Sequence, residues 1–304
     1  MLEYDEAPPA VHFEAMTQRE IDRSVFRRPI ISPLRYPGGK SALYVSLRNL
    51  VRANGLTSGI YVEPYAGGAG AALALLVTGQ VQRIVINDLD PAIYAFWYAV
   101  VRETDAFSRL IDKAALDLKE WSRQREIYQT SAKDDYLRLG FATFYLNRTN
   151  RSGALNGGVI GGQKQAGRYK IDARFNKATL MERVRLIGVY SKRVSLSNVD
   201  GRAVIEEFAD DGEALVYADP PYFDKSSSLY LNAFAEEDHV SLATTLNSLP
   251  RLNWLLTYDN VTKVHELYAD RRREIISLNY SAHRVLKAHE VMIYSDALEL
   301  GLLS

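Results

Sequence analysis

The chain has 304 residues, of which 37 are basic and 37 acidic, and it contains no cysteine. The lack of cysteine excludes disulfide bonds, thiolate metal ligands and a cysteine nucleophile. No apolar run approaches the roughly 18 residues that a membrane-spanning helix needs, and the acidic, polar start is not typical of a signal peptide. We therefore expect a cytoplasmic protein that has no membrane segment.

Residues 1–29 show no clear periodicity and are predicted to form an N-terminal extension. Residues 30–99 then alternate between helix and strand signals. Helical spacing of apolar residues covers 41–52, 71–77 and a segment that starts near residue 91, and short apolar strands are predicted at 60–62 and 81–86. This alternation is typical of a doubly wound α/β domain with a mostly parallel sheet.

A different pattern follows between about residues 100 and 195. Mixed-charge helical segments such as 105–128 precede a glycine-rich stretch at 152–162, and a loop of that length is usually functional or disordered. Strand signals return at 194–196, 214–218, 252–257, 274–278 and 289–295, with a helix predicted at 237–249. We therefore predict one α/β core, formed by residues 30–100 and 194–304, that is split by a helical and loop insert at 101–193.

Basic residues gather in the second half of this insert. From residue 148 to residue 193 there are eleven basic residues and only two acids, Asp172 and Glu182. The basic residues are Arg148, Arg151, Lys164, Arg168, Lys170, Arg174, Lys177, Arg183, Arg185, Lys192 and Arg193. Such a patch can neutralise nucleic-acid phosphates although the whole chain has no net charge. The alternative is a solvated loop and helix face.

The tetrapeptide Asp219-Pro220-Pro221-Tyr222 follows a predicted strand and therefore lies where open α/β sheets bind their ligands. Its two prolines fix the direction of the backbone. The Asp219 carboxylate and a backbone carbonyl are two acceptors that can hold an exocyclic amino group and draw its nitrogen towards sp3 geometry. The Tyr222 ring offers a stacking face for a base that has left the duplex. The motif predicts methylation of an amino nitrogen, and a proline-rich turn with a solvent-facing acid is the alternative.

Upstream, Glu63-Pro64-Tyr65-Ala66-Gly67-Gly68-Ala69-Gly70 joins a predicted strand to a predicted helix. Its small residues let a ligand lie against the backbone, and a helix N-terminus presents N–H donors. A tight turn without a ligand is the alternative. Asp88 ends the next strand, about 20 residues further on, which suits a ribose hydroxyl of a cofactor. Asp88 is equally a plausible N-cap for the helix that begins near Pro91.

A further motif, Arg35-Tyr36-Pro37-Gly38-Gly39-Lys40, precedes the first predicted helix. It can place an aromatic ring and an ammonium over a cofactor that carries a carboxylate, or it can form a plain turn. The five histidines show no ligand spacing with one another beyond the pair His283 and His289, so we predict no metal site.

Together these motifs resemble the Dam-type family of adenine-N6 DNA methyltransferases, the D12 class. Besides the three motifs above and Asn87-Asp88, two further segments resemble the family, Tyr145-Leu146-Asn147-Arg148 and Gly167-Arg168-Tyr169-Lys170. The similarity covers roughly residues 32–298, in matching order. The family's Asn-Gly-Leu-x-Arg-x-Asn run is replaced here by residues 149–156, so the resemblance does not imply a GATC target.

The resemblance implies a Rossmann-like class I methyltransferase core, S-adenosylmethionine as cofactor and double-stranded DNA as partner. The cofactor is predicted to be held by Tyr36, Lys40, Glu63, Ala66, Gly67, Gly68, Asp88 and Asp219. Catalysis is predicted to rest on Asp219, Pro220, Pro221 and Tyr222, and DNA contacts on Arg148, Asn150, Arg151, Lys164 and Arg168 in the insert. We expect a monomer that transfers a methyl group directly to N6 of a flipped adenine within a specific sequence.

Three other functions fit part of the sequence. Methylation of N4 of cytosine, or of RNA, would present an amino nitrogen to the same acceptors. A non-catalytic nucleic-acid binder could keep the same scaffold. A small-molecule or protein-glutamine methyltransferase would fit the neutral net charge but would leave the basic insert unexplained.

Overall fold

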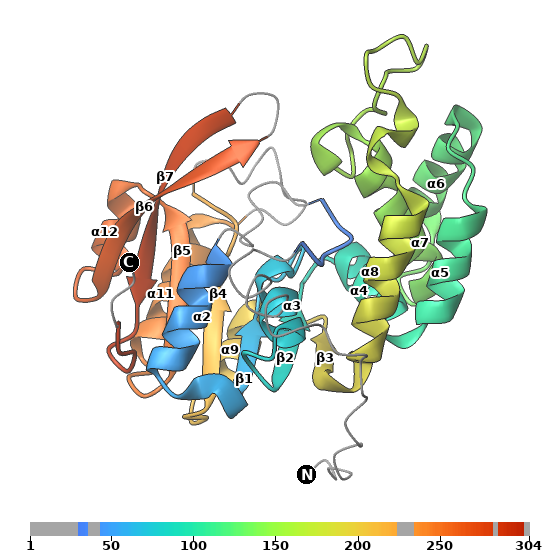
Figure 1. Cartoon of the computed structure of the whole chain (residues 1–304). Coiled ribbons are helices and arrows are strands. Elements are labelled where there is room, and N and C mark those ends of the chain that lie inside the picture. The colour runs from blue at the N-terminus through green and yellow to red at the C-terminus, as the bar shows by residue number, and fades with distance from the viewer. Residues whose placement is uncertain (1–29, 36–42, 224–233, 282–284, 301–304) are drawn as a thin grey trace.

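The computed structural model describes residues 30–35, 43–223, 234–281 and 285–300, and a seven-stranded sheet forms its centre (Figure 1). The strand order is β3-β2-β1-β4-β5-β7-β6. Strands β3, β2, β1, β4 and β5 are parallel, and β7 is antiparallel to both β5 and β6. This arrangement confirms the predicted α/β class with a mostly parallel sheet.

The strands differ in burial according to their position in the sheet. They are β1 (Ile60–Glu63), β2 (Arg83–Asn87), β3 (Val194–Ser197), β4 (Ala214–Ala218), β5 (Asn253–Asp259), β6 (Arg272–Ser281) and β7 (Val285–Tyr294). Every residue of β4 and β5 is buried, as expected for parallel strands that are covered on both faces. A strand of this kind is an almost continuous apolar run, so its sequence reveals the strand but not which face each side chain lines.

Helices cover both faces of the sheet, and each face has its own hydrophobic cluster. On one face α2 (Tyr44–Ala53) and α3 (Gly70–Val77) pack with Tyr61 and Tyr217. The helices on the other face, which pack around Val216, are α9 (Gly201–Glu207), α11 (Glu236–Asn247) and α12 (Thr262–Leu267). The sheet is therefore the middle layer of three.

The chain between β2 and β3 is mostly helical and stands beside the sheet, at the right of Figure 1. Its helices are α4 (Pro91–Arg102), α5 (Thr104–Lys113), α6 (Leu118–Thr130), α7 (Tyr136–Thr149) and α8 (Lys177–Val189). Phe96 of α4, Phe107 of α5 and Phe144 of α7 pack with ring centroids 5.4 to 6.1 Å apart. These rings belong to the same cluster as the α2–α3 side of the sheet, so the insert and the core share one continuous interior.

Helix α7 is an element that the apolar periodicity of the sequence does not predict. All its residues from Leu139 to Asn147 are buried, so the helix has no long polar face to generate a helical repeat in its central turns. A side chain at Gly140 would meet the Ala95 carbonyl oxygen at 2.4 Å from its Cβ. Glycine at this position therefore allows α7 and α4 to approach closely.

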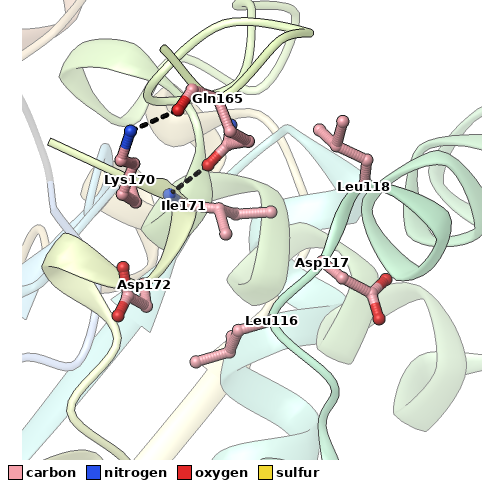
Figure 2. A pocket seen from close by; sticks show the side chains of 7 residues that line it. All are labelled: Leu116, Asp117, Leu118, Gln165, Lys170, Ile171 and Asp172. Atoms are coloured by element: carbon pink, nitrogen blue, oxygen red, sulfur yellow. Dashed lines mark hydrogen bonds between the residues drawn. The ribbon is translucent and has the colours of Figure 1, made fainter. Parts of the chain in front are cut away.

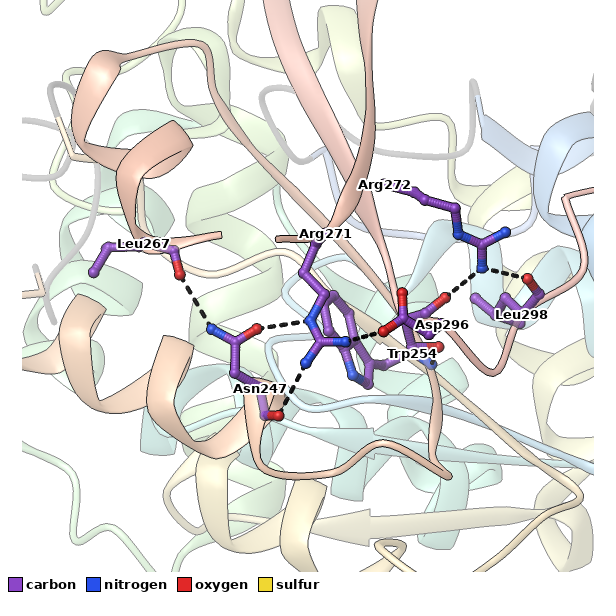
Figure 3. Close-up of polar contacts among 8 residues, drawn as sticks. Asn247, Trp254, Leu267, Arg271, Arg272, Asp296 and Leu298 are labelled. Atoms are coloured by element: carbon purple, nitrogen blue, oxygen red, sulfur yellow. Dashed lines mark hydrogen bonds and ion pairs between the residues drawn. The ribbon is translucent and has the colours of Figure 1, made fainter. Parts of the chain in front are cut away.

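Strands β6 and β7 form a hairpin that is longer than the two strands predicted at 274–278 and 289–295. Only residues 290–294 of β7 pair with β5, so the rest of the hairpin continues beyond the sheet. Its base is fixed by Arg271, whose guanidinium lies 5.9 Å from the centroid of the Trp254 ring and donates to Asn247 and Asp296 (Figure 3). These contacts join the hairpin to the end of α11 and to β5.

Candidate active site

The three predicted site segments that the structure describes meet at the carboxyl edge of the sheet. The loop 63–70 follows β1, Asp88 follows β2 and Asp219 follows β4, and these three strands are neighbours in the sheet. The chain leaves β1 towards α3 on one face and leaves β4 towards α11 on the other. Such a reversal of direction opens the crevice in which α/β sheets bind ligands.

The loop between β1 and α3 is held by the end of β2. Asn87 donates from Nδ2 to the Pro64 carbonyl at 2.8 Å, and its own carbonyl accepts from the Ala66 amide at 2.9 Å. The Gly67 amide donates to Oδ2 of Asp88 at 2.8 Å. Gly67 has a φ of 47°, in the left-handed region that favours glycine. The chain's own contacts therefore fix the shape of this loop.

Both oxygens of Asp88 accept a backbone hydrogen bond. Oδ2 accepts from Gly67, and Oδ1 accepts from the Asp90 amide at 2.9 Å. The N-cap of α4 is Asp90, whose side chain accepts from the Ala92 amide at 2.8 Å, so the structure decides against the N-cap alternative for Asp88. Although part of the side chain stays exposed, burial of the carboxyl raises the pKa of Asp88 to about 7. A carboxylate oxygen has a second lone pair, so both oxygens can still accept from a hydroxyl.

Glu63 ends β1 and is buried beneath the loop. Its Oε1 accepts from the Ala72 amide at 3.0 Å, in the first turn of α3. Burial raises the pKa of Glu63 to about 8, and the nearby carboxylate of Asp219 acts in the same direction. Glu63 thus links the end of the strand to the start of the helix, and its predicted contact with a cofactor stays a prediction.

Asp219 lies directly beyond β4 and is held by the neighbouring strand. Thr257 of β5 donates from Oγ1 to Oδ1 of Asp219 at 2.9 Å. The same Thr257 hydroxyl is 2.8 Å from the hydroxyl of Tyr217, a residue of β4. The sequence did not single out Thr257 as a site residue, because a threonine within an apolar run carries no signal of its own. Its role depends on the register between two strands.

Tyr222 is packed more tightly than its predicted stacking role suggests. Its side chain is 7% exposed and its ring centroid lies 6.3 Å from that of Tyr258. Its hydroxyl donates to Oε1 of Glu290 at 2.6 Å and lies 3.3 Å from Oδ1 of Asp219. Glu290 is a further residue that the sequence did not single out, since β7 was predicted only as a strand. Stacking of a base on Tyr222 stays a prediction.

The arrangement at this edge fits S-adenosylmethionine. Small residues line the loop between β1 and α3. The N-cap of α3 is Ala69, which has no side chain that can cap the helix, so the first amides of α3 are not all used by an N-cap. Asp88 supplies acceptors of the kind that bind ribose hydroxyls. Tyr36 and Lys40, the other two residues predicted to contact the cofactor from the start of the chain, lie outside the described residues.

Four arginines converge where the insert meets the segment 30–35. Burial and the charges of Arg35, Arg183 and Arg174 lower the pKa of Arg148 to about 9. The Arg148 guanidinium still carries its charge at neutral pH. Its Nε is buried and has no hydrogen-bond partner within the part of the chain that the structure describes. Arg148 is therefore a half-buried cation among other cations.

The other residues predicted to contact DNA fall into two groups. Arg151, Lys164 and Arg168 are exposed on the loop that follows α7. Asn150 differs, because its side chain is 0% exposed and its hydrogen bonds are made inside the insert. Its Oδ1 accepts from Trp121 Nε1 at 2.7 Å, and its Nδ2 donates to the carbonyls of Ala154 and Leu155. The Asn150 side chain therefore supports the loop from within.

One open cavity lies within the insert, away from the sheet edge. It has a volume of about 660 Å³ and is lined by Leu116, Asp117, Leu118, Gln165, Lys170, Ile171 and Asp172 (Figure 2). Gln165 uses its amide within its own loop, where Oε1 accepts from the Ile171 amide at 3.0 Å and Nε2 donates to two carbonyls. The polar groups of this cavity are thus largely engaged in holding the loop.

In the described ranges, no helix is long and apolar enough to cross a membrane. In the same ranges, no group of three or more histidine, aspartate or glutamate side chains could hold a metal ion. His12 and His283 lie outside these ranges.

Comparison with known proteins gives a family match that covers most of the chain. The model of a family described as D12 class N6 adenine-specific DNA methyltransferase matches residues 36–283. No curated protein matches. Among solved structures, a SAM-dependent methyltransferase from Agrobacterium tumefaciens is similar with 9% identity and a TM-score of 0.40, over 86% of this chain and 63% of that one. The rRNA methyltransferase aviRa from Streptomyces viridochromogenes is similar with 14% identity and a TM-score of 0.35, over 83% of this chain and 84% of that one.

Proposed function

Because the chain belongs to the D12 class N6 adenine-specific DNA methyltransferase family, we propose that it methylates N6 of adenine in double-stranded DNA, within a specific sequence and after flipping the base out of the duplex. Membership confirms the predicted family, and that family implies the predicted class of enzyme and the predicted cofactor, S-adenosylmethionine. The chain spans 63% of the length of the first solved structure that it resembles, so its activity, substrate and partner are part of the proposal.

The observation that carries the proposal is the position of the Asp219 carboxylate. It lies at the carboxyl end of β4, and its Oδ1 is fixed by Thr257 on the neighbouring strand. We assign to Asp219 and to the carbonyl of Pro220 the acceptance of the two amino hydrogens of adenine. With both hydrogens held, the nitrogen lone pair turns towards the methyl donor. S-adenosylmethionine, when bound, supplies an activated methyl group, so the protein contributes orientation more than acid–base chemistry.

The residues proposed to hold the cofactor surround the loop after β1. Gly67 and Gly68 allow close approach of a ligand to the backbone, with Ala66 beside them. The Asp88 carboxylate is assigned to the ribose hydroxyls, because both of its oxygens keep acceptor capacity. Glu63 fixes the start of α3 through the Ala72 amide.

The basic insert supports DNA as the polymer. A half-buried guanidinium whose Nε has no partner among the described residues is stabilised when an anion accepts from it, and a phosphate is an anion that arginine binds well. Arg148 meets this description, and the exposed Arg151, Lys164 and Arg168 lie on the loop next to it. We assign these four residues to DNA, with Arg148 on the phosphate backbone.

One experiment separates this function from its rivals. Full-length protein is incubated with tritiated S-adenosylmethionine and with unmethylated genomic DNA or total RNA, and the modified nucleosides are identified after digestion. We expect label in DNA as N6-methyladenine. Label as N4-methylcytosine, or label in RNA alone, would overturn the proposed substrate.

Binding of the cofactor tests the non-catalytic alternative. A calorimetric titration of the purified chain with S-adenosylmethionine should give saturable binding. If the protein binds DNA but does not bind S-adenosylmethionine, it is a nucleic-acid binder that keeps only the scaffold.

A further inference from the structure

Three hydroxyl and carboxyl groups form a chain of hydrogen bonds under the predicted catalytic motif. The Tyr217 hydroxyl lies 2.8 Å from Oγ1 of Thr257, and that Oγ1 lies 2.9 Å from Oδ1 of Asp219. Tyr217 is 2% exposed and Thr257 is 0% exposed. The hydroxyls are therefore shielded from water, and each must find its partners within the protein.

The direction of these hydrogen bonds follows from the chemistry of the groups. The Thr257 hydroxyl donates to Oδ1 of Asp219. The single hydrogen of Thr257 is then used, so Tyr217 donates to Thr257. Burial, with the charge of Asp219 acting in the same direction, raises the pKa of the Tyr217 hydroxyl well above its ordinary value, so Tyr217 keeps the hydrogen that it donates.

The register of the sheet brings the three residues to one place. Tyr217 pairs with Leu255 in the parallel β4–β5 ladder. Because side chains alternate along a strand, Asp219 and Thr257 both lie on the same face as this pair, one step nearer the carboxyl edge. Both strands are fully buried, so neither can shift without exposing its apolar face. The Thr257 hydroxyl is consequently a fixed donor.

A second hydroxyl approaches the same carboxylate oxygen less closely. Tyr222 lies 3.3 Å from Oδ1 of Asp219 but only 2.6 Å from Oε1 of Glu290. A hydroxyl has one hydrogen, and the shorter bond to Glu290 engages it more strongly. Of the two hydroxyls, Thr257 is therefore the better-placed donor to Asp219.

We propose that Thr257, supported by Tyr217, is a positioning residue for methyl transfer. It fixes the rotation of the Asp219 carboxylate, so that the side chain presents an acceptor to the substrate amino group before the substrate arrives. Pre-oriented acceptors need no reorganisation during the reaction. This inference rests on the proposed function, since it names how the same carboxylate is held.

Valine is the decisive substitution because it has nearly the shape of threonine and lacks the hydroxyl. We expect Thr257→Val to lower kcat by at least about tenfold, since a small misplacement of a reacting group is costly. The dissociation constant for S-adenosylmethionine should stay within about twofold of the wild type, because the residue acts on orientation and not on uniform binding. Thr257→Ser keeps the donor and should retain kcat within about threefold.

Tyr217→Phe tests the second member of the chain. It removes the support for Thr257 but leaves the donor to Asp219, so kcat should fall only about threefold. In the double variant with Thr257→Val, the Tyr217→Phe change should have no further effect on kcat, because the link through which it acts is already lost. The matched control is Thr143→Val in α7, which removes a buried hydroxyl that donates to the Leu139 carbonyl of its own helix.

Several outcomes would overturn the proposal. These are a wild-type kcat in Thr257→Val, a loss of cofactor affinity as large as the loss of kcat, or additive effects of Tyr217→Phe and Thr257→Val. If Thr257→Val does not fold, Thr257→Ala and Thr257→Ser form the replacement pair, which differs only in the hydroxyl. Crystal structures of the wild type and of the hydroxyl-free variant add a readout without activity: the Asp219 carboxylate should rotate only in the variant. A carboxylate of Asp219 that is unrotated in the variant would overturn this inference. A wild-type protein that methylates no DNA would instead overturn the proposed function.

Discussion

The charged groups at the sheet edge and those in the insert differ in whether the chain itself supplies their hydrogen-bond partners. At the sheet edge, each predicted carboxylate accepts from a donor of the same chain: Asp88 from Gly67, Glu63 from Ala72 and Asp219 from Thr257. In the insert, Arg148 is half-buried among like charges, and its Nε finds no acceptor in the ranges described by the structure.

This difference indicates which part of the machinery is complete in the chain alone. Acceptors that must orient a reacting group are useful only if their geometry is set in advance, and internal donors set it. Donors that recognise a polymer gain their binding energy from the partner, so they can remain uncompensated until it arrives.

The largest effect is expected at the sheet edge. Asp219→Ala removes the carboxylate proposed to hold the adenine amino group, and transfer should fall by about a thousandfold or more. The melting temperature should stay close to that of the wild type, because Asp219 lies beyond the end of β4 and not in its interior. Steady-state methylation of genomic DNA provides the measurement, and wild-type turnover would remove Asp219 from its role.

A second effect concerns a residue that the sequence assigned to DNA and the structure places inside the insert. Asn150→Ala leaves Trp121 Nε1 and two carbonyls without their partner, and it should lower the free energy of unfolding by about 2–3 kcal/mol. The matched control is Asn156→Ala, which alters an exposed asparagine of the same loop. It should change the free energy of unfolding by less than about 0.5 kcal/mol. Urea denaturation measures the free energy of unfolding. Unchanged stability together with weakened DNA binding would indicate that Asn150 contacts DNA.

The basic cluster gives the third prediction. Arg148→Gln should weaken DNA binding about tenfold and reduce the slope of log affinity against log salt by about 1, because one phosphate contact is lost. The protein should not become less stable, since the change removes a poorly compensated charge. Fluorescence anisotropy at several salt concentrations measures the slope. Arg123→Gln, which alters an arginine paired with Glu120, is the control, and an equal slope in both variants would contradict a phosphate contact by Arg148.

The smallest expected effect is a change in pH dependence. Burial raises the pKa of Glu63 to about 8 in the folded chain, above the ordinary value of 4.5 that applies to the unfolded chain. The stabilising contribution of the protonated carboxyl is therefore present below about pH 4.5 and is lost as the pH rises through 8. In Glu63→Gln the loss of stability between pH 5 and 8.5 should shrink by on the order of 1 kcal/mol. Asp88, whose pKa is raised to about 7, should account for part of the remainder.

Denaturation at these two pH values checks the last prediction. If the wild type and Glu63→Gln lose the same stability over this range, Glu63 is ionised in the folded chain at neutral pH. The difference between the sheet edge and the insert would then be larger, because the Ala72 amide would donate to a fully charged carboxylate.

The sequence by itself determined the α/β class, the approximate place of all seven strands and the order of the site motifs. It could do so because strands, caps and turns depend on the side chains of near neighbours. The local sequence pattern did not predict α7, because the central turns of this helix are buried on all sides. It also left open whether Asp88 caps α4 or binds a ribose hydroxyl, because an aspartate shortly before Pro91 suits both roles; the N-cap is Asp90.

Only the tertiary structure decided how distant residues share one site. Thr257 reaches Asp219 through the register of β4 and β5, and Tyr222 reaches Glu290 on β7, although long stretches of chain separate these partners. Asn150 is polar and next to arginines, yet its amide is consumed by Trp121 and the following turn. Hydrogen bonds between residues far apart in sequence leave no periodic trace, so which polar side chains face a ligand, and which face the protein, is settled by packing.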